Sequence, residues 1–349
     1  MTTTTAPETS PPESPARRPS ATSRALWLVL AVLVLAFCGL LSVTFGARDI
    51  AWEDLVAALG GGQDNISQAA VAKRIPRTIL AMLVGASLGL AGAVMQGVTR
   101  NPLADPGILG VTSGASLFVV VGIAFFGMSS STAYIWVAMV GAAVSATFVY
   151  AVGSLGRGGA TPLKLALAGA ATSAAFGSLI SAVLLPRIDV MDSFRFWQIG
   201  GVGGATYPRI MTAVPFLVVG ALVCLAVARG LNALALGDEL AAGLGERVIL
   251  TRILSAVGAV MLCGAATAIA GPIGFVGLVV PHACRLLVGL DHRWLLPFSM
   301  VVGATLLTVA DVVGRVVARP AEVDVGIITA LVGAPVFIAV VRRMRGRAL

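Results

Sequence analysis

The sequence predicts an all-α integral membrane protein with about ten transmembrane helices. Of its 349 residues, 58% are hydrophobic and only 11% are charged, and the mean hydropathy is +0.96. An average soluble domain carries about 25% charged residues. The apolar residues also fall into runs of about twenty, the length that a helix needs to cross a bilayer. Both observations argue against a water-soluble enzyme.

Ten apolar runs are long enough to cross a membrane, five in each half of the chain. We expect spans near residues 25–45, 76–98, 108–127, 133–153, 164–185, 210–229, 248–270, 273–289, 294–313 and 325–341. Residues 1–24 are rich in Thr, Pro and Ser and lack an apolar core, which predicts a disordered cytoplasmic tail and not a cleaved signal peptide. The membrane domain is therefore expected to cover residues 25–345.

The basic residues predict that both termini are cytoplasmic. With the N-terminus inside, fifteen of the 24 Lys and Arg residues fall in inner segments and nine in outer segments. Such a bias is typical of a multi-pass protein of a bacterial plasma membrane, where basic loops also meet anionic lipid. The formal charge of +8 does not indicate nucleic-acid binding, because the basic residues lie between apolar runs and form no tract with aromatics.

Nothing in the sequence indicates a cofactor or metal bound by this chain. The four cysteines lie in apolar segments without CxxC spacing, and the two histidines have no metal-site spacing. There is no Walker P-loop, and we expect no chemical catalysis by this polypeptide.

Three segments are too polar or too glycine-rich to cross lipid. Segments 46–75 and 186–209 are expected outside, and segment 230–247 inside. Segment 186–209 places aromatic residues before four glycines, which predicts a short interfacial or re-entrant helix ending in a flexible turn, with a simple connecting loop as the alternative. Segment 230–247 interleaves leucines with charges and predicts an amphipathic helical pair broken at Gly237, with a helix lying flat on the membrane as the alternative.

The most distinctive motifs recur in a fixed order along the chain. They are Arg74-Ile75-Pro76-Arg77-Thr78, Asn101-Pro102-Leu103-Ala104-Asp105-Pro106-Gly107, Leu231 to Gly237, Gly271 to Leu278, Pro281-His282, Ala310-Asp311, Gly326-Ile327 and Gly333-Ala334-Pro335. In this order and spacing the chain resembles the FecCD family of BtuC-like permeases. These are the membrane subunits of ABC importers for iron-siderophores, haem and cobalamin.

The resemblance implies a type II ABC importer permease fold with two halves of inverted topology. It also implies a dimer with a second or paralogous permease, two cytoplasmic ATPases that hold ATP and magnesium, and a substrate-binding protein outside. A faint echo between Pro106 to Gly110 and Gly271 to Phe275 fits the related halves, since the helices before them would run in opposite directions.

Three sets of candidate site residues follow from the resemblance. Asn101 and Leu103 become cytoplasmic gate residues, with a tight interhelical turn as the alternative. The residues expected to contact the ATPase are Leu234, Leu236, Gly237, Asp238, Glu239, Ala241 and Gly245. Arg74, Arg77 and Arg315 would contact carboxylates of the binding protein, because a guanidinium can hold a carboxylate with two hydrogen bonds; lipid phosphate is their alternative ligand.

A ferric siderophore is the substrate that the resemblance favours first, and haem and cobalamin stay open. The rival of another class is an ion-coupled secondary transporter, which needs ionisable groups within the membrane. Asp311 is the acidic residue that we expect at membrane depth. Arg315 follows it by one helical turn, so a local ion pair is expected there instead of a proton relay.

Overall fold

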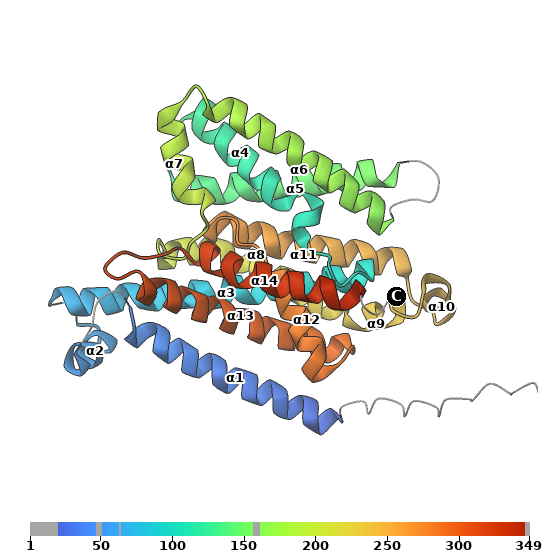
Figure 1. Ribbon diagram of the computed structural model, residues 1–349, viewed down its shortest axis with the longest axis horizontal. Coiled ribbons are helices and arrows are strands. Elements are labelled where there is room, and N and C mark those ends of the chain that lie inside the picture. Colours follow the sequence, from blue (N-terminus) through green and yellow to red (C-terminus); the bar gives the residue numbers. More distant parts are fainter. Residues whose placement is uncertain (1–19, 47–50, 63, 156–160, 346–349) are drawn as a thin grey trace, which may run out of the picture.

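A computed structural model describes residues 20–46, 51–62, 64–155 and 161–345 (Figure 1). Every regular element in these residues is a helix. Most of the predicted tail lies outside the described residues, but its last residues already belong to the first helix, α1 (Ala21–Thr44). The reason is local: the hydroxyl of Ser20 accepts a hydrogen bond from the Ser23 backbone N–H at 3.1 Å and caps the helix.

All ten expected spans are helices, which confirms the predicted count. They are α1, α3 (Ile66–Thr99), α4 (Val111–Phe126), α5 (Ser131–Ser154), α6 (Pro162–Leu184), α8 (Tyr207–Ala226), α11 (Val248–Ala270), α12 (Val276–Val288), α13 (His292–Val317) and α14 (Val325–Arg345). Within the described residues, seven are long and apolar enough to cross a membrane, while α4, α12 and the apolar part of α14 are shorter.

Five shorter helices occupy the connections between the spans. They are α2 (Trp52–Leu59), η1 (Pro106–Leu109), α7 (Ile188–Gln198), α9 (Ala228–Leu234) and α10 (Asp238–Gly243). Helix α7 runs across the direction of the long helices at one end of the bundle (Figure 1). Helices α9 and α10 lie at the opposite end, on either side of Gly237.

Helix α3 forms the centre of the bundle and is longer than the sequence predicts. It starts at Ile66 because the side chain of Asn65 caps it, accepting a hydrogen bond from Gln68 N–H at 2.8 Å. Glycines on α3 allow neighbouring backbones to approach closely: a Cβ on Gly85 would collide with Gly303 of α13, and one on Gly92 with Gly277 of α12. Small residues at such crossings are typical of helix packing in membranes.

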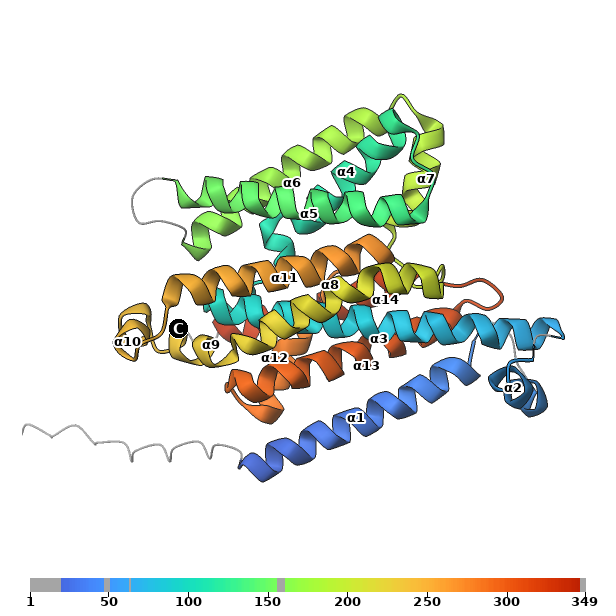
Figure 2. The same cartoon turned by 180° about the vertical axis from the view of Figure 1, so that it is seen from behind.

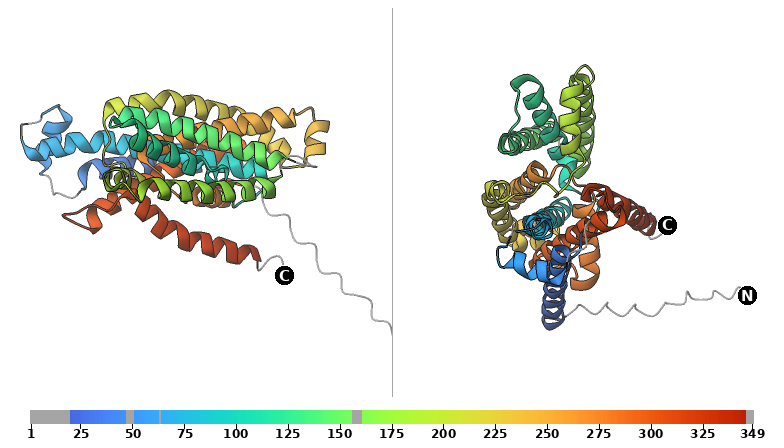
Figure 3. Two further views of the ribbon diagram at one scale, coloured as in Figure 1. Left: turned by 90° about the horizontal axis from the view of Figure 1, so that it is seen from above. Right: turned by 90° about the vertical axis from the view of Figure 1, so that its left-hand side faces the viewer.

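The helices are arranged in two units that meet at α11. Helices α4, α5 and α6 pack on one another and lie to one side, while α3, α8, α11, α12, α13 and α1 form the larger unit (Figures 1 and 2). Seen from the end of the bundle, the long helices of both units run side by side (Figure 3). Helix α11 contacts α3 and α8 on one side and α5 and α4 on the other.

Helices α4 and α12 are short because they begin inside the bundle. The chain after α3 turns back inward, so that Asp105 lines a cavity with Leu88 of α3 and Gly277 of α12. Leu88 lies eleven residues before the end of α3, about 16 Å from that end at 1.5 Å per residue. Both short helices follow the two echoed glycine-proline motifs, and they run in opposite directions, as related halves of inverted topology require.

The glycine turn after α7 is held in place by the fold, contrary to the expectation of a flexible turn. Gly201 N–H donates to Ala270 O at 2.8 Å, and Gly326 N–H donates to Gly200 O at 3.1 Å. Gly200 adopts a φ of +74° and lies so close to Pro272 that a Cβ would overlap its carbonyl. These contacts join α7, α11 and α14 at the end of the bundle where α7 lies.

Candidate functional site

The first candidate group is the outer arginines, whose side chains donate hydrogen bonds mainly to acceptors within the protein. The side chain of Arg74 is buried, and its Nη1 donates to Val43 O at 3.2 Å and Thr44 O at 2.7 Å. These carbonyls belong to the last turn of α1, where backbone oxygens have no partner in the helix itself. Arg74 therefore caps α1 and ties it to α3.

Arg315 is enclosed even more completely, with only 1% of the residue exposed. Its Nη1 donates to Ser42 O at 2.9 Å and Phe45 O at 3.1 Å, and its Nη2 donates to the Ser42 hydroxyl at 2.6 Å. The same guanidinium lies 3.0 Å from the Asp311 carboxylate, which confirms the expected pair one helical turn apart. Both side chains are buried by contacts within the described residues, and the docking of Arg74 and Arg315 to a partner protein stays a prediction.

Arg77 joins this buried group to the outer surface. Its Nε and Nη2 donate to Asp311 Oδ1 at 3.0 and 2.8 Å, and its Nη1 donates to Glu322 Oε2 at 2.5 Å. The Glu322 side chain is 41% exposed, so a partner can reach this end of the guanidinium. We call Arg74, Arg77, Asp311, Arg315 and Glu322 the outer arginine cluster.

Asp311 lies between two guanidinium groups and is 1% exposed. The ion pairs of Asp311 with Arg77 and Arg315 connect α3 to α13 at this point. Sequence reasoning missed Ser42 and Glu322, because no motif marks either residue as a partner of these arginines.

A cavity of about 310 Å³ opens beside the outer arginine cluster, lined by Tyr134, Trp197, Gly201, Gly203, Gly204, Arg209, Ile269, Ala270, Gly271 and Asp324. Arg209 donates there to Gly204 O at 2.9 Å and to Ile269 O at 3.2 Å. Its Nε and the Trp197 indole N–H are buried donors for which the described residues supply no acceptor. Partial burial raises the pKa of Asp324. Sequence reasoning missed this cavity, because its lining comes from five separate segments.

The second candidate group, the inner segment 230–247, presents leucines to solvent. Leu236, Leu240 and Leu244 are 59%, 61% and 70% exposed. Gly237 separates α9 from α10 with a φ of +116°, a conformation that favours glycine. These three leucines form what we call the inner leucine surface.

The structure divides the seven expected ATPase-contacting residues into two sets. Leu234 and Ala241 are fully buried and anchor α9 and α10 to the bundle, and their direct contact with a partner stays a prediction. Leu236, Glu239 and Gly245 are exposed, and Gly237 and Asp238 lie between them with partial exposure. Leu240 and Leu244 were absent from the expected set, although both are exposed in the same segment as Leu236.

The third candidate group, the gate loop at residues 100–105, lies beside α10. Arg100 ends α3 in a left-handed conformation, with a φ of 50°. Asn101 is exposed, and its side-chain oxygen accepts a hydrogen bond from Leu103 N–H at 2.9 Å, which holds a tight turn. Asp238 of α10 forms ion pairs with Arg100 and, at 2.9 Å, with Arg252. The structure thus joins the candidate gate loop to the candidate coupling helix.

A polar network mounts α9 on the start of α13. Asn232 donates to Asp291 at 2.7 Å and accepts from His292 N–H at 2.9 Å. Hydrogen bonds from Arg293 lower the pKa of Asp291 to about 2, so this carboxylate stays charged at neutral pH. The inner leucine surface is therefore fixed to a long span at one end and to the gate loop at the other.

The described residues contain no group of three or more His, Cys, Asp or Glu side chains placed to hold a metal ion.

Comparison with known proteins places this architecture among ABC transporters. The model of the FecCD transport family matches residues 33–343. The chain therefore belongs to the FecCD family, and it is a multi-pass transport permease of the ABC importer type and not an enzyme.

Individual relatives give the same result. YfiZ of Bacillus subtilis (strain 168), a permease protein named for a siderophore transport system, is 42% identical over 324 residues, which are 91% of this chain and 96% of YfiZ. The cobalamin import system permease protein BtuC of Halobacterium salinarum is 42% identical over 280 residues, 79% of this chain and 74% of that protein. A chain of a metal-chelate type ABC transporter in an inward-facing conformation has a TM-score of 0.80 at 30% identity, covering 91% of this chain and 99% of its own.

Proposed function

We propose that this chain is one half of a dimeric, ATP-driven importer that moves a ferric siderophore, delivered by a substrate-binding protein, across a bacterial cytoplasmic membrane. The observation that carries the proposal is the inner leucine surface. Three large apolar side chains are exposed there, on α10 and in the turns on either side of it, outside the long spans. The same segment is joined to the gate loop by the ion pair between Asp238 and Arg100. Neither a channel nor a secondary transporter needs such a surface.

The inner leucine surface would seat in a groove of a cytoplasmic ATPase, which holds ATP and magnesium. An amphipathic helix that docks in a groove uses apolar anchors with charged flanks, as Leu236 and Leu240 are flanked by Asp238 and Glu239. Burying a leucine contributes about 1.5 to 3 kcal/mol, so three leucines suffice to hold a partner. A movement of the ATPase would pull on α10 and, through Asp238 and Arg100, on the gate loop.

The exposed face of helix α6 supports the proposal that a second permease copy lies beside this one. Its exposed face carries small residues, which are Ala170, Ala171, Ala174, Ala175, Gly177, Ser178, Ser181 and Ala182. A Cβ on Gly177 would meet no atom of this chain within 4 Å. Small residues on an uncovered membrane helix allow another helix to pack closely against it. They also leave room beside the helix for the pathway of a polar ligand. A second copy or a paralogous permease would complete the pathway there.

Arg77 is the docking residue that we retain for the binding protein. Its guanidinium already holds the exposed carboxylate of Glu322, so an incoming carboxylate could replace that partner without disturbing Asp311. An arginine suits this exchange because its planar fork binds carboxylates with two hydrogen bonds.

The choice of a ferric siderophore is supported by the name and the nearly full-length match of YfiZ. The cobalamin permease relative is equally identical over a shorter region, and haem permeases belong to the same resemblance. The test must therefore offer all three ligands.

Uptake in proteoliposomes tests the proposal. The permease is reconstituted with the ATPase and binding protein encoded beside it, and labelled ferric siderophore, haem and cobalamin are supplied in parallel with ATP inside. We expect siderophore uptake that stops when the catalytic glutamate of the ATPase is replaced. Uptake driven by a proton gradient without the ATPase would overturn the importer assignment, and uptake of haem or cobalamin alone would overturn the substrate.

The orientation has its own test. Cysteine substitutions at Leu244 and Glu322 should be labelled by an impermeant maleimide from opposite sides of the membrane in intact cells and in inverted vesicles. Labelling of position 244 from outside would reverse the proposed topology with both termini in the cytoplasm.

A further inference from the structure

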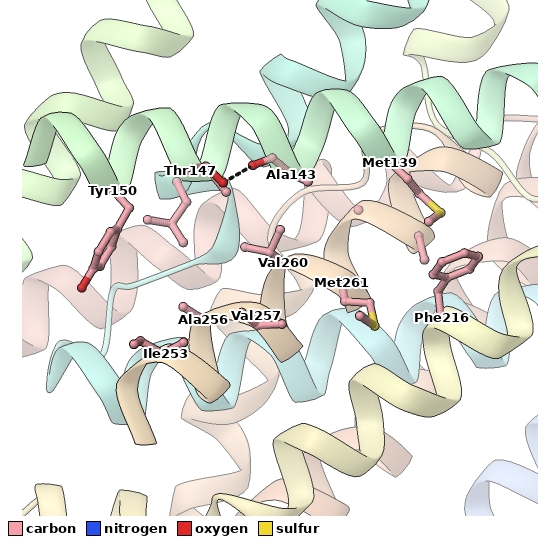
Figure 4. A pocket seen from close by; sticks show the side chains of 14 residues that line it. Met139, Ala143, Thr147, Tyr150, Phe216, Ile253, Ala256, Val257, Val260 and Met261 are labelled. Carbon is pink, nitrogen blue, oxygen red and sulfur yellow. Dashed lines mark hydrogen bonds between the residues drawn. The ribbon is translucent and has the colours of Figure 1, made fainter. Parts of the chain in front are cut away.

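A groove of about 410 Å³ lies on the surface of the bundle where its two units meet (Figure 4). Its walls are α5 on one side and α8 and α11 on the other, with Leu109 of η1 at the bottom. Small side chains create the hollow: Ala143 and Ala146 on α5 face Ala256, Gly264 and Ala265 on α11. Neither α6 nor α14 contributes to its lining.

The groove has the length and depth of one lipid acyl chain. Along α5 it extends from Met139 to Tyr150, eleven residues or about 16 Å at 1.5 Å per residue. The hydrocarbon core of a bilayer is about 30 Å thick, so this is about one leaflet. Met139 and Phe216 lie at one end of the groove and Tyr150 at the other, near the end of α5 (Figure 4).

A second cavity continues the groove toward the inner membrane surface. It measures about 140 Å³ and shares Leu109, Tyr150 and Ala256 with the groove. Arg252 lines this second cavity, and its side chain is 38% exposed. Tyrosine and arginine are the side chains that typically lie at the level of lipid head groups.

The inner end of the groove has a surplus of positive charge. Arg252 and Arg100 both pair with the single carboxylate of Asp238. One of the two positive charges is therefore uncompensated within this group. A phosphodiester with its single negative charge would balance it, and a guanidinium binds phosphate oxygens with two hydrogen bonds.

We propose that this groove is a binding site for a phospholipid of the inner leaflet, with one acyl chain between α5 and α11 and its phosphate at Arg252. Lipid surrounds the bundle at this depth, and the walls are apolar over the whole length of one leaflet. The charge at the inner mouth selects the orientation of the lipid.

The location gives the lipid a role in the movement of the permease. Helix α11 joins the unit of α4, α5 and α6 to the rest of the bundle, and the acyl chain would fill the space beside that joint. Leu109, which follows the gate loop in sequence, forms the bottom of both cavities. The lipid would therefore pack against Leu109 of η1, which follows the gate loop.

Native mass spectrometry of the purified permease tests the site. The protein is delipidated and then titrated with 1-palmitoyl-2-oleoyl-phosphatidylglycerol. The double variant Ala143→Leu with Ala256→Leu fills the groove, and we expect it to lose the tightest bound lipid, at least tenfold in apparent affinity. The variant Ala36→Leu enlarges an exposed position on α1 instead and should bind like the wild type.

A second variant separates the head group from the chain. Arg252→Gln should keep the lipid but lose the preference for phosphatidylglycerol over phosphatidylcholine, each supplied in the same titration. If the filled variant elutes and unfolds like the wild type and still binds the lipid with equal affinity, the groove is not the site. Equal loss in Ala36→Leu would also overturn the proposal, because the effect would then be general to the lipid-facing surface.

Discussion

The outer arginine cluster and the inner leucine surface look equally suited to partner proteins in the sequence, yet the structure treats them in opposite ways. Arg74 and Arg315 are buried, and their donors are used by carbonyl oxygens at the end of α1 and by Asp311. Leu236, Leu240 and Leu244 are exposed, and nothing in the described chain covers them.

A side chain whose polarity does not suit its surroundings can be paired within the chain or can contact another protein, and these two regions show one case each. Charges at the outer end of a membrane bundle are costly unless paired, and here they pair with each other and with backbone oxygens. The exposed leucines outside the long spans are not covered by apolar residues of the same chain, because α9 and α10 are too short to fold over them. The inner leucines therefore need a partner, while most of the outer arginines already have theirs.

The largest expected effect comes from the inner leucine surface. Replacing Leu236 and Leu240 with Asp should remove about 3 to 6 kcal/mol of contact energy with the ATPase, at about 1.5 to 3 kcal/mol for each buried leucine. ATP-dependent uptake should fall by more than about 100-fold, since 1.4 kcal/mol corresponds to tenfold. The variant Glu239→Gln, at an exposed position of the same helix, is the control and should transport normally. Normal uptake by the double variant would show that the leucines contact no partner.

The outer arginine cluster should respond through stability and not through docking. Arg315→Leu leaves Asp311 with one cation and leaves the oxygens of Ser42 and Phe45 without their donor. Breaking a buried pair in this way costs about 3 to 5 kcal/mol. Thermal unfolding in nanodiscs measures the loss, with Arg195→Leu on the exposed face of α7 as the control. A normal melting temperature combined with weaker affinity for the binding protein would restore Arg315 as a docking residue.

A smaller effect distinguishes Arg77 from its buried neighbours. If Arg77 exchanges Glu322 for a carboxylate of the binding protein, Glu322→Gln should remove the competitor and strengthen docking in low salt. Partly exposed pairs contribute up to about 1 kcal/mol, so the gain should be about fivefold at most. Surface plasmon resonance against the binding protein measures it, and Arg77→Glu should act in the opposite direction. An unchanged affinity in both variants would limit Arg77 to a structural role.

The smallest effect is expected where the inner segment meets the gate loop. Asp238→Asn breaks two partly exposed ion pairs, with Arg100 and Arg252, so stability should change by less than about 1 kcal/mol for each pair. ATP hydrolysis by the complex should continue while uptake per ATP falls, because the gate loop no longer follows α10. The ratio of transport to hydrolysis is the measurement. An unchanged ratio would remove Asp238 from the coupling path.

Much of the fold could be predicted, because each span must carry its own apolar residues. The bounds of α11 match the predicted span at both ends, since Gly271 interrupts the helix where the apolar run stops. Helix α3 could not be bounded in this way: its first turns are polar, and only the Asn65 cap and the packing of α2 extend it to Ile66. The inward course of residues 100–110 was also hidden, because a short run before α4 resembles an ordinary turn.

The site was harder to predict than the fold. Arg77 and Asp311 are 234 positions apart and share one ion pair. Sequence spacing shows a pair such as Asp311 and Arg315, which lies on one helix, and conceals one that two helices form across the bundle. The same limit explains why Leu234 and Leu236 seemed equivalent, although one is buried and the other is exposed.

The sequence by itself determined the membrane class, the ten spans and the family, because hydropathy and motif order act along the chain and do not depend on packing. Only the tertiary structure decided which of the marked residues are available. Burial depends on the neighbours that the fold brings to each side chain. Arg74 and Arg315 are therefore buried and bonded within the chain, whereas Leu236, Leu240 and Leu244 stay at the surface. The groove between α5 and α11 likewise exists only where two distant stretches of small residues meet.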